Sequence, residues 1–144
     1  MKNFKESDFR GWYKDMDHGL LEVIEKFAES LDYDIFISPA SGGIGRRMSP
    51  TAKSFHNITK YGKVQAIDLM INKTLTPDEW RDVFEKAKLA GATGIGLYPD
   101  WNPTNGVHLD VGKRPGKSPD NPAKWSAYRV NGKQKYFSID KAFS

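Results

Sequence analysis

The sequence predicts an α+β fold, with a small, mostly antiparallel sheet and helices packed on one side of it. One stretch repeats apolar residues at the spacing of an amphipathic helix, and a second carries the capping residues of a helix. Several short apolar runs between Gly, Pro and Asn residues have the length of strands. Helices and strands do not alternate regularly along the chain, as they do in parallel α/β folds. The 144 residues suffice for one hydrophobic core, so we expect a single domain over residues 1–144.

The first half of the chain predicts a helix, a strand and a long loop. Residues 18–32 carry apolar side chains at helical spacing, namely Leu20, Leu21, Val23, Ile24, Phe27 and Leu31. His18, at the beginning of this helix, is expected to be a surface or capping residue. Residues 34–38, DIFIS, predict a strand, and the Gly-, Ser- and Pro-rich residues 39–55 predict a loop whose length is typical of functional or disordered segments.

The second half predicts a central strand, a capped helix and further strands. Residues 64–71, VQAIDLMI, are continuously apolar apart from two positions, as in a strand buried on both faces. Thr76 and Glu79 have the spacing of a capping box, and Gly91 ends the helix that they begin. Strands are predicted over 93–99 and 105–112. The core therefore covers about 17–125, and Asn131-Gly132 predicts a type I′ hairpin over about 126–138.

Composition limits the possible partners and metal ligands. A net charge of +4 suits an anionic partner, and it is also typical of a mildly basic protein without one. The absence of cysteine excludes disulfides and thiolate-bound zinc, so a metal would need His and carboxylate ligands. No apolar stretch has the length of a membrane span, and the first residues lack the features of a signal peptide. We therefore expect synthesis in the cytoplasm and no membrane partner.

Asp68 is the most informative residue of the predicted central strand, because it lies between Ile67 and Leu69. A buried carboxylate must be hydrogen-bonded, ion-paired or bound to a metal. Two histidines are candidates to share a metal with it: His56 at the end of the long loop and His108 within a predicted strand. Each histidine alone is more typical of an ordinary core or surface position. Together the three residues are enough for a catalytic zinc site with an open fourth position.

Two motifs resemble those of the D-Ala-D-Ala carboxypeptidase and L-alanyl-D-glutamate endopeptidase family. Residues 54–68 are similar to its Ser-x-His…Gly…Ala-x-Asp signature, and residues 94–110 to its Gly-x-Gly-x-Tyr-Pro and Val-His-x-Asp strands. Trp125 is similar to an Arg-Trp element of some members, with Lys124 in place of the arginine. The resemblance covers roughly residues 35–125. It implies a zinc peptidase of the Hedgehog-like fold, with His56, Asp68 and His108 as metal ligands.

The chain departs from the family pattern at two places. His56 and Asp68 are twelve positions apart, which is more than usual, so the intervening residues are expected to bulge out as a loop. Asn105 stands three residues before His108, where many members carry a carboxylate. Asp110 and Asp100 therefore remain as candidates for the general base. Asp110 shares a strand face with His108 and is equally suited to orient that histidine.

The long loop supplies candidates for substrate binding. The resemblance implies an arginine that holds a substrate carboxylate or carbonyl, for which Arg46 or Arg47 is suited, with Ser54 beside them. Either arginine taken singly is as typical of a solvated basic turn. The GGIGRR stretch lacks the Gly-Lys-Ser/Thr ending of a phosphate-binding loop.

The resemblance implies a zinc-dependent hydrolase of bacterial peptidoglycan peptides, of the phage endolysin or virion lysin type, that acts as a monomer at the cell wall. The alternative is a non-catalytic zinc-containing binding or structural domain, such as a virion component. Residues 113–135 combine basic and aromatic side chains that are able to stack on bases, but no nucleic-acid-binding signature accompanies them. We therefore expect no nucleic acid partner.

Overall fold

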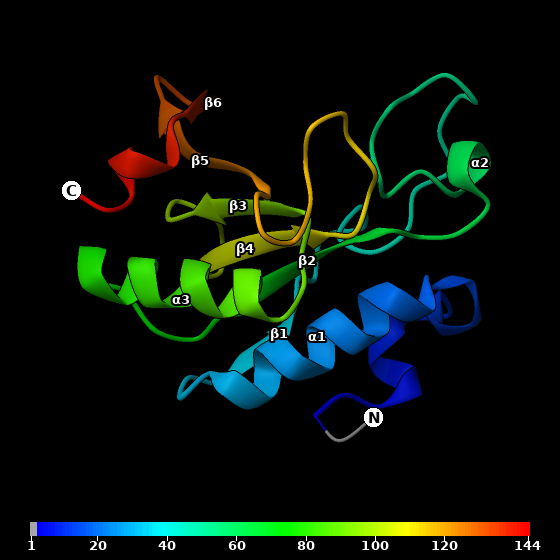
Figure 1. Cartoon of the computed structure of the whole chain (residues 1–144), viewed down its shortest axis with the longest axis horizontal. Coiled ribbons are helices and arrows are strands. Elements are labelled where there is room, and N and C mark those ends of the chain that lie inside the picture. Colours follow the sequence, from blue (N-terminus) through cyan, green and yellow to red (C-terminus); the bar gives the residue numbers. More distant parts are fainter. Residues whose placement is uncertain (1–2) are drawn as a thin grey trace.

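The computed structural model describes residues 3–144 as an α+β fold built on one six-stranded sheet (Figure 1). The sheet has the order β1-β2-β4-β3-β5-β6. Its strands are β1 (Ile35–Ile37), β2 (Ala66–Ile71), β3 (Gly94–Tyr98), β4 (Asn105–Asp110), β5 (Ala123–Val130) and β6 (Lys133–Phe137). The predicted α+β class is confirmed.

The sheet is mixed rather than only antiparallel. Neighbouring strands run antiparallel except β3 and β5, which are parallel. The reason is the connection between β4 and β5. Gly94, the first residue of β3, pairs both with the last residue of β4 and with the first residue of β5. The loop 111–122 therefore returns the chain to the same end of the sheet, on the far side of β3 from β4.

Two helices cover one face of the sheet, α1 (His18–Ser30) and α3 (Pro77–Leu89) (Figure 1). The Asp17 side chain accepts a hydrogen bond from the backbone N–H of Leu20, so Asp17 rather than His18 caps α1, and His18 is exposed. The predicted capping box of Thr76 and Glu79 is confirmed at the beginning of α3. Four shorter helices complete the described chain: η1 (Glu6–Phe9), η2 (Tyr13–Asp15), α2 (Ile58–Tyr61) and η3 (Ile139–Lys141).

Strand β2 separates the core from the opposite face of the sheet. All six of its residues are buried. Ile67, Leu69 and Ile71 belong to the hydrophobic cluster formed with the helices, whereas Asp68 points to the other face because successive side chains alternate along a strand. Arg46 and His56, from the loop between β1 and α2, contact Asp68 on that other face, which helps to explain why a strand with a central aspartate is buried throughout.

The C-terminal hairpin of β5 and β6 forms the far edge of the sheet. Asn131 and Gly132 have φ values of 53° and 76°, as a type I′ turn requires, so the predicted hairpin is confirmed. Within residues 3–144, no helix has both the length and the apolar character that crossing a membrane requires.

Candidate metal centre

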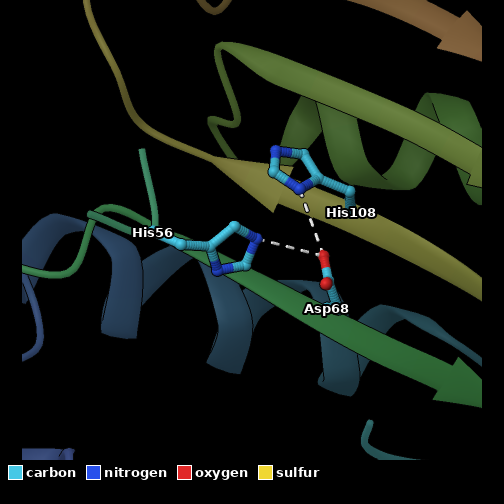
Figure 2. Close-up of side chains that lie close together, drawn as sticks. All are labelled: His56, Asp68 and His108. Atoms are coloured by element: carbon cyan, nitrogen blue, oxygen red, sulfur yellow. Dashed lines mark hydrogen bonds and ion pairs between the residues drawn. The ribbon is translucent and has the colours of Figure 1, made fainter. Parts of the chain in front are cut away.

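Three residues that are distant in the sequence meet on the helix-free face of the sheet (Figure 2). Asp68 on β2 and His108 on β4 are directly opposite each other across the two strands. His56 approaches from the end of the long loop, immediately before Asn57, whose side chain caps α2. The two strands hold two of the side chains in register, and the capped turn holds the third.

The three side chains converge on one small volume. Oδ1 of Asp68 lies 3.1 Å from Nδ1 of His108 and 3.4 Å from Nε2 of His56, and both contacts are drawn in Figure 2. All three ligand atoms lie within 4.8 Å of one another. His56 and Asp68 are buried and His108 is largely so. This group has the size and donor types to hold a metal ion.

The ring of His56 is oriented by the backbone. Its Nδ1 lies 2.6 Å from the carbonyl oxygen of Ile44, which can only accept, so Nδ1 carries the hydrogen. The other ring nitrogen, Nε2, is then the one that faces Asp68. A metal ligand needs this orientation, because the ring nitrogen that does not bind the ion is the one held by the backbone.

The ring of His108 is oriented by a carboxylate. Its Nε2 donates to Oδ2 of Asp110 at 2.7 Å. Asp110 has no exposed surface and also accepts two hydrogen bonds of 2.8 Å from the guanidinium of Arg114 and one from the backbone N–H of Gly112. Both of its oxygens are therefore occupied, and Nδ1 of His108 is the nitrogen that faces Asp68.

The charges of this network favour ionised partners in the metal-free protein. Burial lowers the pKa of His108, but hydrogen bonds to Asp110 and Asp68 outweigh it and raise that pKa to about 9. Burial disfavours the charged form of an aspartate as well, so by itself it would raise the pKa values of Asp68 and Asp110. For Asp68 the two histidines outweigh that effect, and for Asp110 Arg114 and His108 do, so both pKa values lie well below the ordinary range. A metal that binds Nδ1 of His108 must displace a proton.

The residues between His56 and Asp68 leave the sheet as expected, but they form a helical turn rather than an open loop. This turn is α2, which ends at Gly62 with a φ of 73°. After it, the backbone N–H of Gln65 donates to the carbonyl of Phe55 and returns the chain to β2. The long interval between the two motif residues is therefore compatible with a shared site.

The predicted substrate-binding residues separate into two groups. Arg46 lies beside the centre, with Nη2 at 3.9 Å from Oδ2 of Asp68, and Ser54 lines the cavity in front of it. Arg47 is exposed and lies over the ring of Trp12, outside that cavity. The Arg47 prediction therefore finds no support in the geometry.

Asp100, a candidate for the general base, and Asn105, which departs from the family pattern, both lie outside the cavity in front of the centre. Asp100 is exposed and accepts a hydrogen bond from the backbone N–H of Arg129. Asn105 is buried and donates to the carbonyls of Ile71 and Lys73. Asn105 thus has a structural role at the other end of β4, and the contact of Asp100 is with the backbone of β5.

The Gly-x-Gly strand makes room for the site. A side chain at Gly94 would collide with the Asp110 carboxylate, and a Cβ at Gly96 would lie 2.5 Å from Nε1 of Trp125. Gly96 pairs with His108 on one side and with Trp125 on the other. The absence of side chains at Gly94 and Gly96 therefore leaves room over β3 for the Asp110 carboxylate and the Trp125 indole.

Comparison with protein-family models, curated proteins and solved structures finds no match.

An aromatic wall borders the centre, and sequence reasoning identified only part of it. Nε1 of Trp125 donates to the hydroxyl of Tyr98 at 2.8 Å, and Tyr98 stacks on Trp101 with ring centroids 3.9 Å apart. Burial raises the pKa of Tyr98, so its hydroxyl stays protonated at neutral pH. Trp101 had no distinguishing signal, because it lies in the Pro- and Asn-rich connection between β3 and β4.

Sequence reasoning also missed Arg114 and the carbonyl of Ile44. Arg114 lies in a basic loop in which no single cation stands out. The Ile44 carbonyl that accepts a hydrogen bond from His56 belongs to the backbone, so no side chain in the sequence marks it. The only available signal for Arg114 was its position four residues after Asp110, and such spacing brings side chains together only if the loop turns back.

The donor set determines what the centre can do. Two imidazole nitrogens and one carboxylate oxygen suit a divalent transition metal, and three protein ligands leave a position open for water or substrate. A cavity of about 460 Å³ lies in front of them, lined by the three ligands together with Arg46, Ser54 and the aromatic wall. The site therefore combines a possible metal position with space for a ligand.

Proposed function

We propose that this protein is a zinc-dependent peptidase that cleaves peptide bonds of bacterial peptidoglycan, and that it is encoded by a phage as an endolysin or a virion-associated lysin. The single observation that carries the proposal is the convergence of His56, Asp68 and His108 within 4.8 Å, at the positions where the two sequence motifs resemble a zinc peptidase family. The cell-wall location follows from the proposed substrate.

The chain's own residues have separate roles in this proposal. His56, Asp68 and His108 hold the ion. When bound, zinc supplies a water of lowered pKa and polarises the scissile carbonyl. Arg46 lines the cavity beside Asp68. Within residues 3–144 the only other hydrogen bond or ion pair of its side chain runs from Nε to the carbonyl of Gly42, so one guanidinium edge is available to a carbonyl or carboxylate of the peptide.

Asp110 acts in this proposal by positioning His108 rather than as the general base. Its oxygens accept hydrogen bonds from His108, Gly112 and Arg114, and Asp110 does not line the cavity in front of the three ligands. Its lowered pKa also makes it a weak proton acceptor. Asp100, the other candidate, does not line the cavity.

One observation favours a second candidate function, a non-catalytic zinc-binding domain such as a virion component. Among residues 3–144, the two cavities beside the centre are lined by no carboxylate other than Asp68 and Asp110. Both of these carboxylates already contact histidine side chains: Asp68 contacts His56 and His108, and Asp110 contacts His108. A peptidase of this kind would have to take its proton acceptor from the substrate or from a rearrangement of these residues.

The two functions separate in one experiment. The protein is purified without chelator, its metal content is measured by elemental analysis, and purified cell walls are digested with it while released peptides are identified by mass spectrometry. We expect one zinc per chain and new peptide termini, both lost in His56→Ala and His108→Ala and both kept in His18→Ala. A protein without metal contradicts both functions, whereas a zinc protein that cleaves no wall peptide is the binding domain.

A further inference from the structure

The positive charge of the chain is concentrated at its C-terminal end. Residues 123–144 contain five Lys and Arg residues against one Asp, so their formal charge of +4 equals the net charge of the whole sequence. In the rest of the chain, Lys and Arg residues balance Asp and Glu residues in number. Such a charge asymmetry between parts of a chain is typical of a surface that meets an anionic partner.

Four of these five cations share one face of the C-terminal hairpin. Lys135 pairs with Tyr128 across the two strands, and Lys133 is two residues away on the edge strand β6 (Figure 1), so both lysines point to the same side. Lys124 is four residues before Tyr128 on β5, and Lys141 of η3 lies over the Tyr128 ring. These four residues form the lysine patch: Lys124, Lys133, Lys135 and Lys141.

The lysine patch lies on the opposite face of the sheet from the metal centre. Trp125 lies next to His108, with ring centroids 5.3 Å apart, and successive side chains alternate along β5, so Lys124 points away from the centre. The fifth cation, Arg129, pairs with Gln134, which lines the cavity on the other face. A partner bound at the lysine patch therefore leaves the cavity of the metal centre open.

The ammonium groups of the patch have no anionic partner. All four lysines are exposed, and every ion pair within residues 3–144 involves other residues. Lys124 lies over the Phe84 ring and Lys141 over two rings of the hairpin, contacts that leave the charges unneutralised. The only carboxylate side chain of residues 123–144 is that of Asp140. An excess of positive charge therefore remains available on this face.

The extent of the patch favours a polymer over a single small anion. Lys135 is opposite Tyr128, and Lys124 precedes Tyr128 by four strand residues, which span about 13 Å. A small anion cannot contact both ends of such a patch. An ammonium group acts as a compact point charge that suits phosphate oxygens, whereas the planar fork of arginine is the better match for a carboxylate. The patch contains lysines alone, which favours a chain of phosphodiesters.

The patch lacks the free aromatic face on which nucleobases stack. Nζ of Lys141 covers the rings of Phe137 and Tyr128, at 3.8 and 4.7 Å from their centroids. The exposed ring of the hairpin, that of Tyr136, lines the cavity on the other face. Proteins that bind single-stranded nucleic acid combine positive charge with such stacking. The geometry therefore favours a polymer that carries charge but no bases.

We propose that the lysine patch binds a flexible phosphodiester polymer without bases, of the polyol-phosphate class. The inference goes beyond the proposed peptidase function, because neither a metal nor cleavage enters it. Lysines on an edge strand also prevent pairing with strands of other molecules, which is the competing explanation for Lys133 and Lys135.

The proposal is tested by binding. The probe is soluble poly(glycerol phosphate), and its affinity is measured by calorimetry with metal-free and with zinc-loaded protein. We expect equal binding by both forms, weakened about tenfold or more when salt is raised from about 50 to about 200 mM, because bound lysines release counterions. Poly-glutamate of equal charge should bind more weakly. The proposal is overturned by no binding, by poly-glutamate that binds as tightly, or by single- or double-stranded DNA that binds more than about tenfold tighter.

Lysine variants locate the effect. Lys133→Gln with Lys135→Gln should reduce the affinity about tenfold or more at low salt and roughly halve the salt dependence, since two of four contacts are lost. Lys133→Arg with Lys135→Arg keeps the charge and should keep the affinity. The matched control is Lys14→Gln with Lys26→Gln, which removes two charges from exposed positions on η2 and α1 and should change the affinity little.

Two outcomes with the variants contradict the patch. An equal loss of affinity in both glutamine double variants would show that only the total charge matters. An unchanged affinity in Lys133→Gln with Lys135→Gln, accompanied by aggregation, would show that these lysines protect the edge strand. The result is also independent of cleavage: a protein that binds the polymer but cleaves no wall peptide keeps the patch and loses the peptidase, and a peptidase that does not bind the polymer loses only the patch.

Discussion

The Asp110 carboxylate lies 2.7 Å from Nε2 of His108, the ring nitrogen that does not contact Asp68. This contact sets which nitrogen of the histidine is available to a metal. From the sequence alone, Asp110 was equally suited to orient the His108 ring and to accept a proton. This contact supports the orienting role.

Asp110→Asn should weaken zinc binding by about ten- to a hundredfold, the usual effect of losing a partner that orients a metal-ligating histidine. The amide has only one oxygen to accept hydrogen bonds, so it cannot serve His108 and the Arg114 fork together. The measurement is competition with a chromophoric chelator. Asp100→Asn is the matched control and should leave affinity and cleavage unchanged. If Asp110→Asn keeps full zinc affinity and loses only cleavage, Asp110 is the general base instead.

Asp68→Asn should lower zinc affinity by orders of magnitude, because the amide keeps the shape of the side chain but removes the charge that stabilises the cation. Zinc content and thermal unfolding are to be measured on the same preparation. A variant that keeps its zinc and loses only thermal stability would show that Asp68 is a buried ion-pair partner of the two histidines and not a ligand.

The metal-free protein should lose stability as the pH rises from about 6.5 to about 9. The pKa of folded His108 is raised from its ordinary value of 6.5 to about 9. The stabilisation is therefore complete below 6.5, where the histidine is charged in both the folded and unfolded chain, and it disappears above 9. Because the side chain is buried, we expect an effect on the order of a few kcal/mol. Urea unfolding with a chelator present measures it at several pH values.

His108→Gln is the control for this pH dependence and should show little of it. The zinc-loaded protein should also lack it, since Nδ1 of His108 then carries no proton at any of these pH values. A metal-free protein that gains stability over this range would contradict the assigned charge of His108.

Gly96→Ala should destabilise the protein by about 1–3 kcal/mol, the usual cost of inserting a methyl group into a closely packed site. The new Cβ would lie 2.5 Å from Nε1 of Trp125, so the indole must move and its hydrogen bond to Tyr98 must break. Chemical denaturation gives the free energy, and tryptophan fluorescence reports the displacement. Leu89→Ala, at a side chain that is 83% exposed, should change the stability little.

Local patterns were sufficient for most of the fold. The helices α1 and α3 were predicted from spacing and capping residues, and the hairpin from Asn131-Gly132, because these signals depend on neighbours in the sequence. The parallel pairing of β3 with β5 was not predicted. It depends on the end of the sheet to which a proline-rich loop returns, and no short-range pattern encodes that.

The candidate site was predictable only where a motif marked it. His56, Asp68 and His108 were selected together because of their residue types and the resemblance, and the fold brings them together. Arg47 was selected because the resemblance implies an arginine in the long loop, and Asp100 because it is a carboxylate before β4. The chain directs Arg47 to Trp12 and Asp100 to the backbone of β5. The residue type determines which contacts a side chain is able to make, but the direction in which the side chain points depends on the tertiary structure.

The alternation along β2 makes its length a strict requirement. Ile67 and Leu69 face the helices, and Asp68 between them faces His56 and His108. Inserting or deleting one residue in this strand would turn the aspartate into the hydrophobic core and an isoleucine or leucine toward the histidines. In homologous or engineered sequences that keep the site, gaps in the alignment should therefore fall in the loop before β2 or after it, and not within the strand.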